Sequence, residues 1–329
     1  MVFEGMRPMK TEDAKEIIAC LPSGRTVYPY HPDRYAVQLL ELVMDEPVSI
    51  SELRDSAYGK LLSRPALKSV VAECGSGTLS RDDLAKAWPI DVEAYRLTLT
   101  TWGPEREKDW DRWYYQTSRP GQNLVLQLNF SNAHNQAYGK VITAADKSPF
   151  AFHGHPVVEK DWHTLAWARL DIDLDAGVAL IEELQSDWVK FSREAADQAH
   201  KALTGAYGEP EKRIVYDGQT LDAEAVRAYY NDVVAPHAKV WDEAMLSAAI
   251  WFLVSEIGVG QIYLHDHVSG CKLKNLSFCQ PPRSLYTKLP RRFCFQKTRQ
   301  GPPFLFEKPD RRMRKLMKTG DLAFWQLAV

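Results

Sequence analysis

The stretch that most constrains the fold of this chain is TLAWARLDIDLDAGVALIEELQSDW, residues Thr164–Trp188. In its first half, bulky or charged side chains alternate with small or polar neighbours, as in a half-buried strand. Asp175-Ala176-Gly177 predicts a tight turn, because glycine accepts positive φ and aspartate can bond the backbone ahead of it. Val178–Leu184 then predicts an apolar strand, which ends abruptly in Gln185-Ser186-Asp187.

This polar strand end is the best candidate for a functional site. Because successive strand residues point to opposite faces, Glu183, Gln185 and Asp187 should share one face of the sheet. Glu182 and Ser186 should share the other face. A carboxylate at a strand end can act as a base, and a nearby amide or hydroxyl can orient a carbonyl or a water. The structural alternative is that Ser186 or Asp187 caps the helix that follows.

The predicted elements indicate an α+β fold, with a mixed central sheet flanked by helices. Residues 1–92 are expected to be mainly helical. They include a short first strand over Val2–Met6, which can join the main sheet, and a first helix from Thr11, which can pack on that sheet. Helical patterns follow at Tyr35–Met44, at Ile50–Cys74 with Pro65 between two short helices, and at Thr78–Trp88.

Residues 93–329 are expected to form the α/β domain, with an insert over residues 190–235 after the central strand. A two-residue turn at Asp217-Gly218 predicts a hairpin within this insert. The other expected elements are the strands Ala94–Trp102, Leu124–Phe130 and Gln261–His265, a turn or helix start at Asn132–Tyr138, and helices from Trp188 to about Leu203, over Asp222–Val234 and over Trp241–Ile257.

The charge of the chain is unevenly distributed. The net charge is only −2, but the basic region, residues 271–329, has 14 Lys and Arg against 3 Asp and Glu, a balance of +11. The first 270 residues therefore have 27 against 40, a balance of −13. Such a division predicts either a polyanionic partner, such as nucleic acid bound through residues 271–318, or docking of the basic region on the acidic body. Within the region, Phe293 and Phe295 alternate as in a strand and are expected to lie in the core.

Composition and motifs exclude several classes of protein. No apolar run approaches the length of a membrane span, residues 1–16 lack the apolar core of a signal peptide, and five scattered cysteines do not suggest a disulfide framework. We therefore expect a cytoplasmic protein with no membrane partner.

The residue types of a zinc site occur at His265, His267, Cys271 and Cys279, but their spacing is not a recognised zinc pattern, so no metal is expected. Three alternating acids are expected to form a solvated edge: Asp171, Asp173 and Asp175.

Two sets of motifs carry a family resemblance. The first set comprises the LAWAR strand, the EELQSDW strand end, a helix from Pro236 to Trp241 and beyond, and Gly258 before the next strand. It resembles a domain of the large polyvalent proteins of phages and mobile elements, although Val189 stands where that domain usually has His. The matching residues are Leu165, Ala166, Arg169, Glu183, Gln185, Ser186, Asp187, Trp188, Pro236, Trp241 and Gly258. This resemblance implies a mobile-element or conflict setting.

The second resemblance is broader. MRPMKTEDAKEII is similar to the first strand and helix of the GNAT acetyltransferase fold, ARLDIDLDAGVALIEELQ to its central hairpin, Trp241–Ile257 to its long helix, and IYLHDH to its next strand. LYTKLPRRFCF resembles the terminal Tyr-x-x-x-x-Phe segment, so Tyr286 is the candidate acid that protonates the departing thiolate. The resemblance implies an acyl-CoA cofactor held near the strand end, with Trp188, Arg193 and Arg283 as candidate contacts. QSDWVKFSREA stands where that family has a glycine-containing turn.

The resemblances together imply a GNAT-like group (acyl) transferase of phage-conflict or mobile-element type, such as a toxin that modifies nucleic acid or protein. Asp187 or Glu183 is the expected base, Gln185 and Ser186 are expected to hold the substrate or donor, and Tyr286 is the expected acid. Two alternatives stay open. One is an ADP-ribosyltransferase-type toxin, and the other is a non-enzymatic accessory protein that binds nucleic acid or a protein partner.

Overall fold

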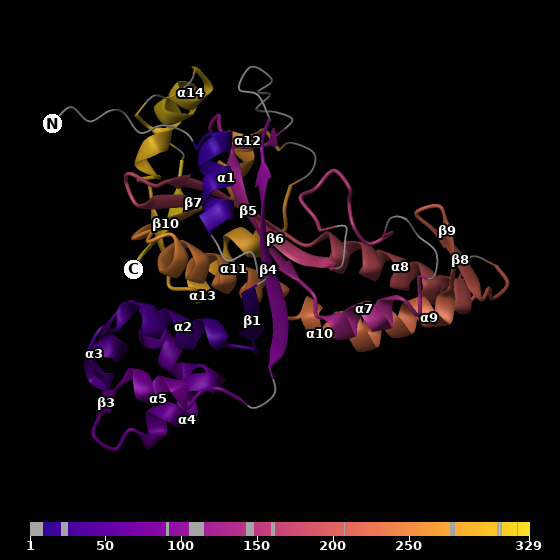
Figure 1. Cartoon of the computed structure of the whole chain (residues 1–329), viewed down its shortest axis with the longest axis horizontal. Helices are drawn as coiled ribbons and strands as arrows, with labels where there is room; N and C mark the ends of the chain where they lie inside the picture. Colours follow the sequence, from indigo (N-terminus) through magenta and orange to yellow (C-terminus); the bar gives the residue numbers. More distant parts are fainter. Residues whose placement is uncertain are drawn as a thin grey trace.

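The hairpin Thr164–Trp188 lies in the middle of a large mixed sheet (Figure 1). This computed structural model describes residues 9–20, 26–89, 92–104, 115–142, 148–158, 162–206, 208–276, 280–307, 309, 311–320 and 322–329. Within these residues, eight strands form one sheet in which every neighbouring pair is antiparallel except the parallel pair β7–β10. In spatial order they are β1 (Thr26–Tyr30), β4 (Glu93–Trp102), β5 (Asn123–Asn129), β6 (Thr164–Asp173), β7 (Val178–Gln185), β10 (Gln261–His265), β12 (Phe324–Ala328) and β11 (Gln296–Thr298).

The turn between β6 and β7 forms as its residues predict. Gly177 has φ 62°, a conformation that glycine adopts without steric cost, and Asp173 Oδ1 accepts a hydrogen bond of 3.1 Å from the Ala176 amide. The Gly177 carbonyl also accepts from the amides of Gly260 and Gln261, at 3.0 and 3.2 Å. These bonds tie the turn to the start of β10, so one glycine helps to set the register of the parallel pair.

The two faces of the sheet bury different cores. On one face, Ala179 and Ile181 of β7 join the larger hydrophobic core, which includes the long helix α11 (Trp241–Trp251) and its π-helical continuation η4 (Phe252–Glu256). On the other face, Val178 and Leu180 join a smaller core with α12 (His267–Lys274) and α14 (Arg311–Thr319). The predicted alternation of β7 is therefore correct over its first half.

The helices α2–α5 form a lobe beside the sheet, whereas α1 lies against the sheet itself (Figure 1). The predicted helices of this region occur. Pro65, which was expected between two short helices, is the first residue of the second of them, and Ser80 forms a capping box with Asp83. β1 was not predicted, and it adds a strand of this region to the main sheet, next to β4. The predicted strand Val2–Met6 lies outside the described residues. The elements are α1 (Thr11–Cys20), α2 (Arg34–Val43), β2 (Val48–Ser49), α3 (Ile50–Asp55), η1 (Gly59–Ser63), α4 (Pro65–Glu73), β3 (Thr78–Leu79) and α5 (Arg81–Ala85).

The segment after β7 forms an arm that projects away from the sheet (Figure 1). The predicted hairpin turns at Asp217 and Gly218, whose φ values of 47° and 72° are those of a type I′ turn. The helix predicted over Asp222–Val234 exists but becomes a π-helix in its second half. The elements are α8 (Asp187–Leu203), β8 (Arg213–Tyr216), β9 (Gln219–Asp222), α9 (Ala223–Ala228), η3 (Tyr229–Val234) and α10 (Ala235–Ala238).

The C-terminal region differs most from its prediction. Phe293 and Phe295 are buried, at 0% and 3% exposure, but they lie in a turn after α13 (Lys288–Arg292) rather than in a strand. β11 and β12 were not predicted, and β12 pairs with β10. The remaining elements are α7 (Asn132–Tyr138), η5 (Arg283–Tyr286) and η6 (Pro303–Leu305).

In the described part of the chain, no helix combines the length and the apolar character that crossing a membrane requires.

Candidate active site

β7 contains a bulge at the point where its polar end begins. Leu170 pairs with Ile181, but the next pair is Arg169 with Glu183, so Glu182 is one residue in excess on β7. The expectation that Glu182 and Glu183 point to opposite faces is therefore wrong. A bulge interrupts the alternation on which that expectation depended, and both carboxylates reach groups that lie over the same face of the sheet.

The first of these carboxylates, Glu183, forms an ion pair with Arg169. Arg169 also donates to the Tyr115 carbonyl at 2.6 Å and to the Gln116 carbonyl at 3.1 Å, so its guanidinium is fixed on three sides. Burial would raise the pKa of Glu183, but the adjacent Arg169 charge holds that pKa below its usual range. Glu183 is thus an ionised carboxylate with a fixed partner rather than a free base.

The second carboxylate, Glu182, lies in a fully buried network. Its Oε1 accepts from the Ser118 amide at 2.7 Å, and its Oε2 accepts from Ser118 Oγ and from His265 Nε2, each at 3.0 Å. Lys274 Nζ donates to the Glu182 carbonyl at 2.7 Å. Burial would raise the pKa of Glu182, but the hydrogen bond and charge of His265 and the charge of Lys274 lower it to about 2. This network stabilises the bulge with charge-assisted hydrogen bonds.

Beyond the bulge, Asp187 holds a histidine that the sequence did not identify as functional. Asp187 Oδ2 lies 2.8 Å from His155 Nδ1, and its Oδ1 accepts from Gln185 Nε2 at 2.7 Å. The Asp187 side chain is only 5% exposed, whereas that of His155 is 26% exposed. Gln185 Nε2 also lies 3.1 Å from His155 Nδ1. In the tautomer whose Nδ1 donates to the carboxylate, the lone pair of the ring is on Nε2, which is the arrangement of a general base.

Aromatic side chains surround the His155 ring. Its centroid lies 4.7 Å from that of Phe152, 5.4 Å from that of Trp167 and 6.4 Å from that of Trp102, with all three rings steeply inclined to it. Phe152 is 51% exposed, so this apolar wall continues to the surface. A substrate that reached the ring would therefore meet an apolar surface beside the Asp187–His155 pair.

Ser186 has the capping role that the sequence analysis kept as its alternative. Its Oγ accepts from the Val189 amide at 3.2 Å, which makes Ser186 the N-cap of α8. The same hydroxyl donates to the Leu165 carbonyl at 2.6 Å. Both bonds hold the first turn of α8 against β6, and this contact positions Asp187 next in the chain.

Tyr286 lies where β7 and β10 separate. Their parallel pairing ends at Leu264 and Ile181, and beyond that point the Leu184 amide donates to the Tyr286 hydroxyl at 3.4 Å. Lys274 binds the neighbouring Glu182 carbonyl, so two side chains replace a strand along this edge of β7. Tyr286 is 2% exposed, and burial raises the pKa of its hydroxyl far above the usual range, which keeps the proton in place.

The three candidate cofactor contacts have different surroundings. Trp188 is 1% exposed and donates from Nε1 to the Tyr229 hydroxyl at 2.8 Å, inside the core. Arg193 is exposed on α8 and donates to the Tyr230 hydroxyl at 2.8 Å. Arg283 is exposed and lines a cavity of about 380 Å³ beside α12. Trp188 and Arg193 thus bind neighbouring tyrosines of η3, whereas Arg283 is the only one of the three that lines the cavity beside α12.

The residues with zinc-ligand chemistry have other partners. His265 Nε2 binds Glu182, and His267 Nε2 donates to the Pro281 carbonyl at 3.1 Å. Cys279 lies outside the described residues. Among those that are described, no group of three or more His, Cys, Asp or Glu has an arrangement that could hold a metal ion.

Part of the basic region docks on the acidic body. Arg292 forms an ion pair with Glu243, and Lys297 Nζ lies 2.9 Å from Asp266 Oδ2. Lys274 is buried beside the two glutamates of β7. Other basic residues of the region are exposed, including Arg311, Lys315 and Lys318 on α14.

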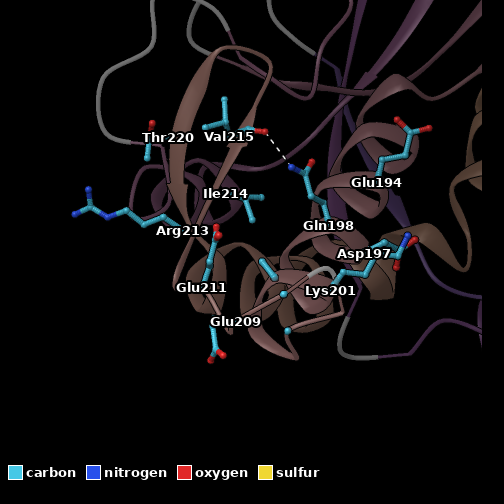
Figure 2. Close-up of a pocket in the computed structure, with 13 residues that line it drawn as sticks. Glu194, Asp197, Gln198, Lys201, Glu209, Glu211, Arg213, Ile214, Val215 and Thr220 are labelled. Atoms are coloured by element: carbon cyan, nitrogen blue, oxygen red, sulfur yellow. Dashed lines mark hydrogen bonds between the residues drawn. The ribbon is translucent and has the colours of Figure 1, made fainter.

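A cavity of about 750 Å³ lies in the arm, away from the end of β7. Figure 2 shows its lining between α8 and the β8–β9 hairpin, with Gln198 bonded to the Val215 carbonyl across it, at 3.1 Å. The side chains of Arg213 and Glu209 point outward rather than into the cavity (Figure 2). None of the predicted catalytic residues lines it, so its position argues against a role in the chemistry at the strand end.

Sequence reasoning missed four residues of the site: Ser118, His155, Arg169 as the partner of Glu183, and Lys274. The available signal for His155 was the sequence His153-Gly154-His155 just before the hairpin, which placed a histidine near the strand end without showing which ring nitrogen was free. No family model, curated protein or solved structure matches this chain.

Proposed function

We propose that this chain is a group-transfer enzyme in which His155 is the general base and Asp187 orients it. The observation that carries the proposal is the 2.8 Å contact between a buried carboxylate and a partly exposed imidazole at the end of a central strand. His155 rather than Asp187 or Glu183 is assigned as the base, because Asp187 is buried behind it and Glu183 is paired with Arg169.

The chemistry follows from the donors and acceptors. His155 Nε2 takes the proton from the hydroxyl or amine of an acceptor as that group attacks the donor. Asp187 stabilises the imidazolium that forms, and Gln185 holds Asp187 by donating to its other oxygen. Tyr286 is proposed as the acid for the leaving group, as the resemblance to acetyltransferases implies.

An acyl-CoA is the proposed donor, on a GNAT-like fold. The hairpin β6–β7, the long helix α11 and the strand β10 occur in the order on which that resemblance depends, and this order supports the proposal. The α8 N-terminus differs from an ordinary phosphate site, since Asp187 stands in its first turn and would repel an anion. The phage or mobile-element setting, a toxin role and a cytoplasmic location are parts of the same proposal.

The exposed cations of α14 favour a second candidate, binding of a polyanion such as nucleic acid. Arg311, Lys315 and Lys318 are exposed on one helix, and counterion release from a polyanion would make such binding steeply dependent on salt. This candidate predicts that His155→Gln leaves binding unchanged, since His155 lies beside β6 and β7 rather than on α14.

A thermal-shift screen followed by a transfer assay tests the proposal. Acetyl-CoA should raise Tm. A rise in Tm with NAD instead would favour an ADP-ribosyltransferase, and a rise with nucleic acid would favour a nucleic-acid-binding protein. With the stabilising donor, His155→Gln should lower kcat by about 10²–10⁴-fold, as expected for loss of a general base. His200→Gln, which changes an exposed histidine further along α8, is the matched control. Full activity of the His155→Gln variant would exclude the proposed mechanism.

A further inference from the structure

A second cavity, of about 510 Å³, lies at the edge formed by β1 and β4. Tyr95 of β4 lines this cavity, whereas Trp102 of the same strand lies beside His155. These two residues are an odd number of positions apart, and successive strand side chains alternate between faces. The cavity is therefore on the opposite face of the sheet from the Asp187–His155 pair and is independent of it.

Four segments of the chain build this cavity. They are the end of β1, the start of β4, α7 and the bend from η3 to α10, and Figure 1 shows α7 and α10 side by side near β4. The π-helix η3 and Pro236 at the start of α10 together shape one wall. π-helical turns are rare in proteins, and those that occur often lie at functional sites. The lining residues are Tyr30, His31, Pro32, Glu93, Tyr95, Ser131, Ala133, His134, Ala137, Asp232, Val233, Pro236, His237 and Val240.

His134 and His237 form the floor of the cavity, and both are uncharged at neutral pH. Burial lowers the pKa of His134 to about 3 and that of His237 to about 4. His134 Nε2 bonds to the Tyr229 hydroxyl at 2.7 Å, and His237 Nδ1 bonds to the Tyr95 hydroxyl at 2.8 Å. Both rings are thus fixed by neutral hydrogen bonds, and they present an uncharged surface.

The walls are apolar and the rim is acidic. Pro32, Val233 and Val240 contribute apolar surface, while Glu93 and Asp232 are exposed carboxylates. None of the described residues that line the cavity is Lys or Arg. The positive charge of Arg34 lowers the pKa of the lining residue His31. The Arg34 guanidinium itself donates to the Pro29 carbonyl and lies 4.6 Å from the centre of the Trp88 ring, so it already has partners within the protein.

We propose that this cavity binds a small amphipathic amine, with its apolar body against the neutral floor and walls and its ammonium group at Glu93 and Asp232. The volume is that of a small-molecule site. An uncharged floor favours an apolar group, and two rim carboxylates without a lining cation favour a positive charge over a negative one.

Titration calorimetry of the full chain with 2-phenylethylamine tests this site, with phenylacetate as the ligand of opposite charge. We expect saturable binding of the amine and none of the acid. The double variant Glu93→Gln/Asp232→Asn should bind the amine about ten-fold more weakly, roughly three-fold for each exposed carboxylate. Glu209→Gln, which removes an exposed carboxylate of the arm, is the control that should leave binding unchanged.

Three results would overturn the proposal. They are equal binding of phenylacetate, absence of saturable binding of the amine, and unchanged affinity in the double variant. Both changed side chains are exposed, so the variant should fold, and its melting curve checks this directly. His155→Gln should not alter amine binding, so the outcome is separate from that of the proposed transferase reaction.

Discussion

The Ser186 hydroxyl donates to the Leu165 carbonyl at 2.6 Å, and this bond joins the residue that follows β7 to the second residue of β6. The same hydroxyl accepts the Val189 amide and starts α8. Because Asp187 is the next residue, the cap and the candidate catalytic carboxylate are adjacent in the chain but have different tasks. Substitutions can therefore separate stability from activity at this strand end.

Ser186→Ala should destabilise the protein while leaving the Asp187–His155 contact in place. Loss of an N-cap costs about 1 kcal/mol, and the Leu165 carbonyl loses a partner as well. Chemical denaturation measures the loss, and a transfer assay at a temperature well below Tm should show activity close to that of the wild type. A large loss of activity in a fully folded variant would instead assign Ser186 a direct role.

Asp187→Asn should have the opposite profile. The amide keeps the size of the carboxylate but can present an N–H to His155, which disfavours the tautomer with its lone pair on Nε2. We expect kcat to fall by about 10³-fold or more, with a change in stability of only about 1 kcal/mol from the lost charge in the first turn of α8. Nitrogen chemical shifts of the His155 ring report the tautomer without any need for substrate. An unchanged tautomer would contradict this account of Asp187.

The buried network around Glu182 predicts a specific response to acid. The folded-state pKa of Glu182 is lowered to about 2, so its stabilisation is complete above the unfolded-state pKa near 4.5 and is lost as the pH falls from 4.5 towards 2. Denaturation of the wild type and of Glu182→Gln between pH 7 and pH 2.5 measures it. The variant should lose less stability over this range, and parallel curves for the two proteins would show that Glu182 is not responsible.

Tyr286→Phe tests the residue at the divergence of β7 and β10. The ring should still fill its buried site, and loss of the bond from the Leu184 amide should cost about 1 kcal/mol. If Tyr286 protonates the leaving group, kcat should fall by about 10²-fold while the affinity for the donor is kept. Donor affinity from the thermal-shift titration provides the comparison. A loss of donor binding with kcat unchanged would make Tyr286 a binding residue.

The parts of the fold that were predictable depend on local signals. Gly177 with its preceding aspartate, the Asp217-Gly218 turn and the Ser80 capping box each act within a few residues, so their patterns can be read directly from the sequence. β12 gave no such signal, because its place between β10 and β11 depends on pairing with distant strands. The same reason explains why β1 was missed.

The acidic residues of β6 show how distant partners changed a reasonable prediction. Asp171 and Asp173 were expected on a solvated edge, but they are only 2% and 3% exposed. Arg119, 52 residues earlier in the chain, forms two bonds of 2.8 Å with Asp171. His155 was overlooked for a similar reason, since 32 residues separate it from Asp187. A carboxylate in a strand therefore cannot be assigned to solvent or to the core until its partner is known.

The bulge in β7 leaves Glu182 outside the pairing register of the strand. Pairing continues from Ile181 to Glu183 as though Glu182 were absent, so a gene encoding the strand without that residue would still place Glu183 opposite Arg169 and Gln185 opposite Trp167. A single-codon insertion at this point adds one buried acid and leaves every downstream side chain on its original face. The buried network therefore depends on one residue of β7 whose addition does not change the pairing of the residues on either side of it.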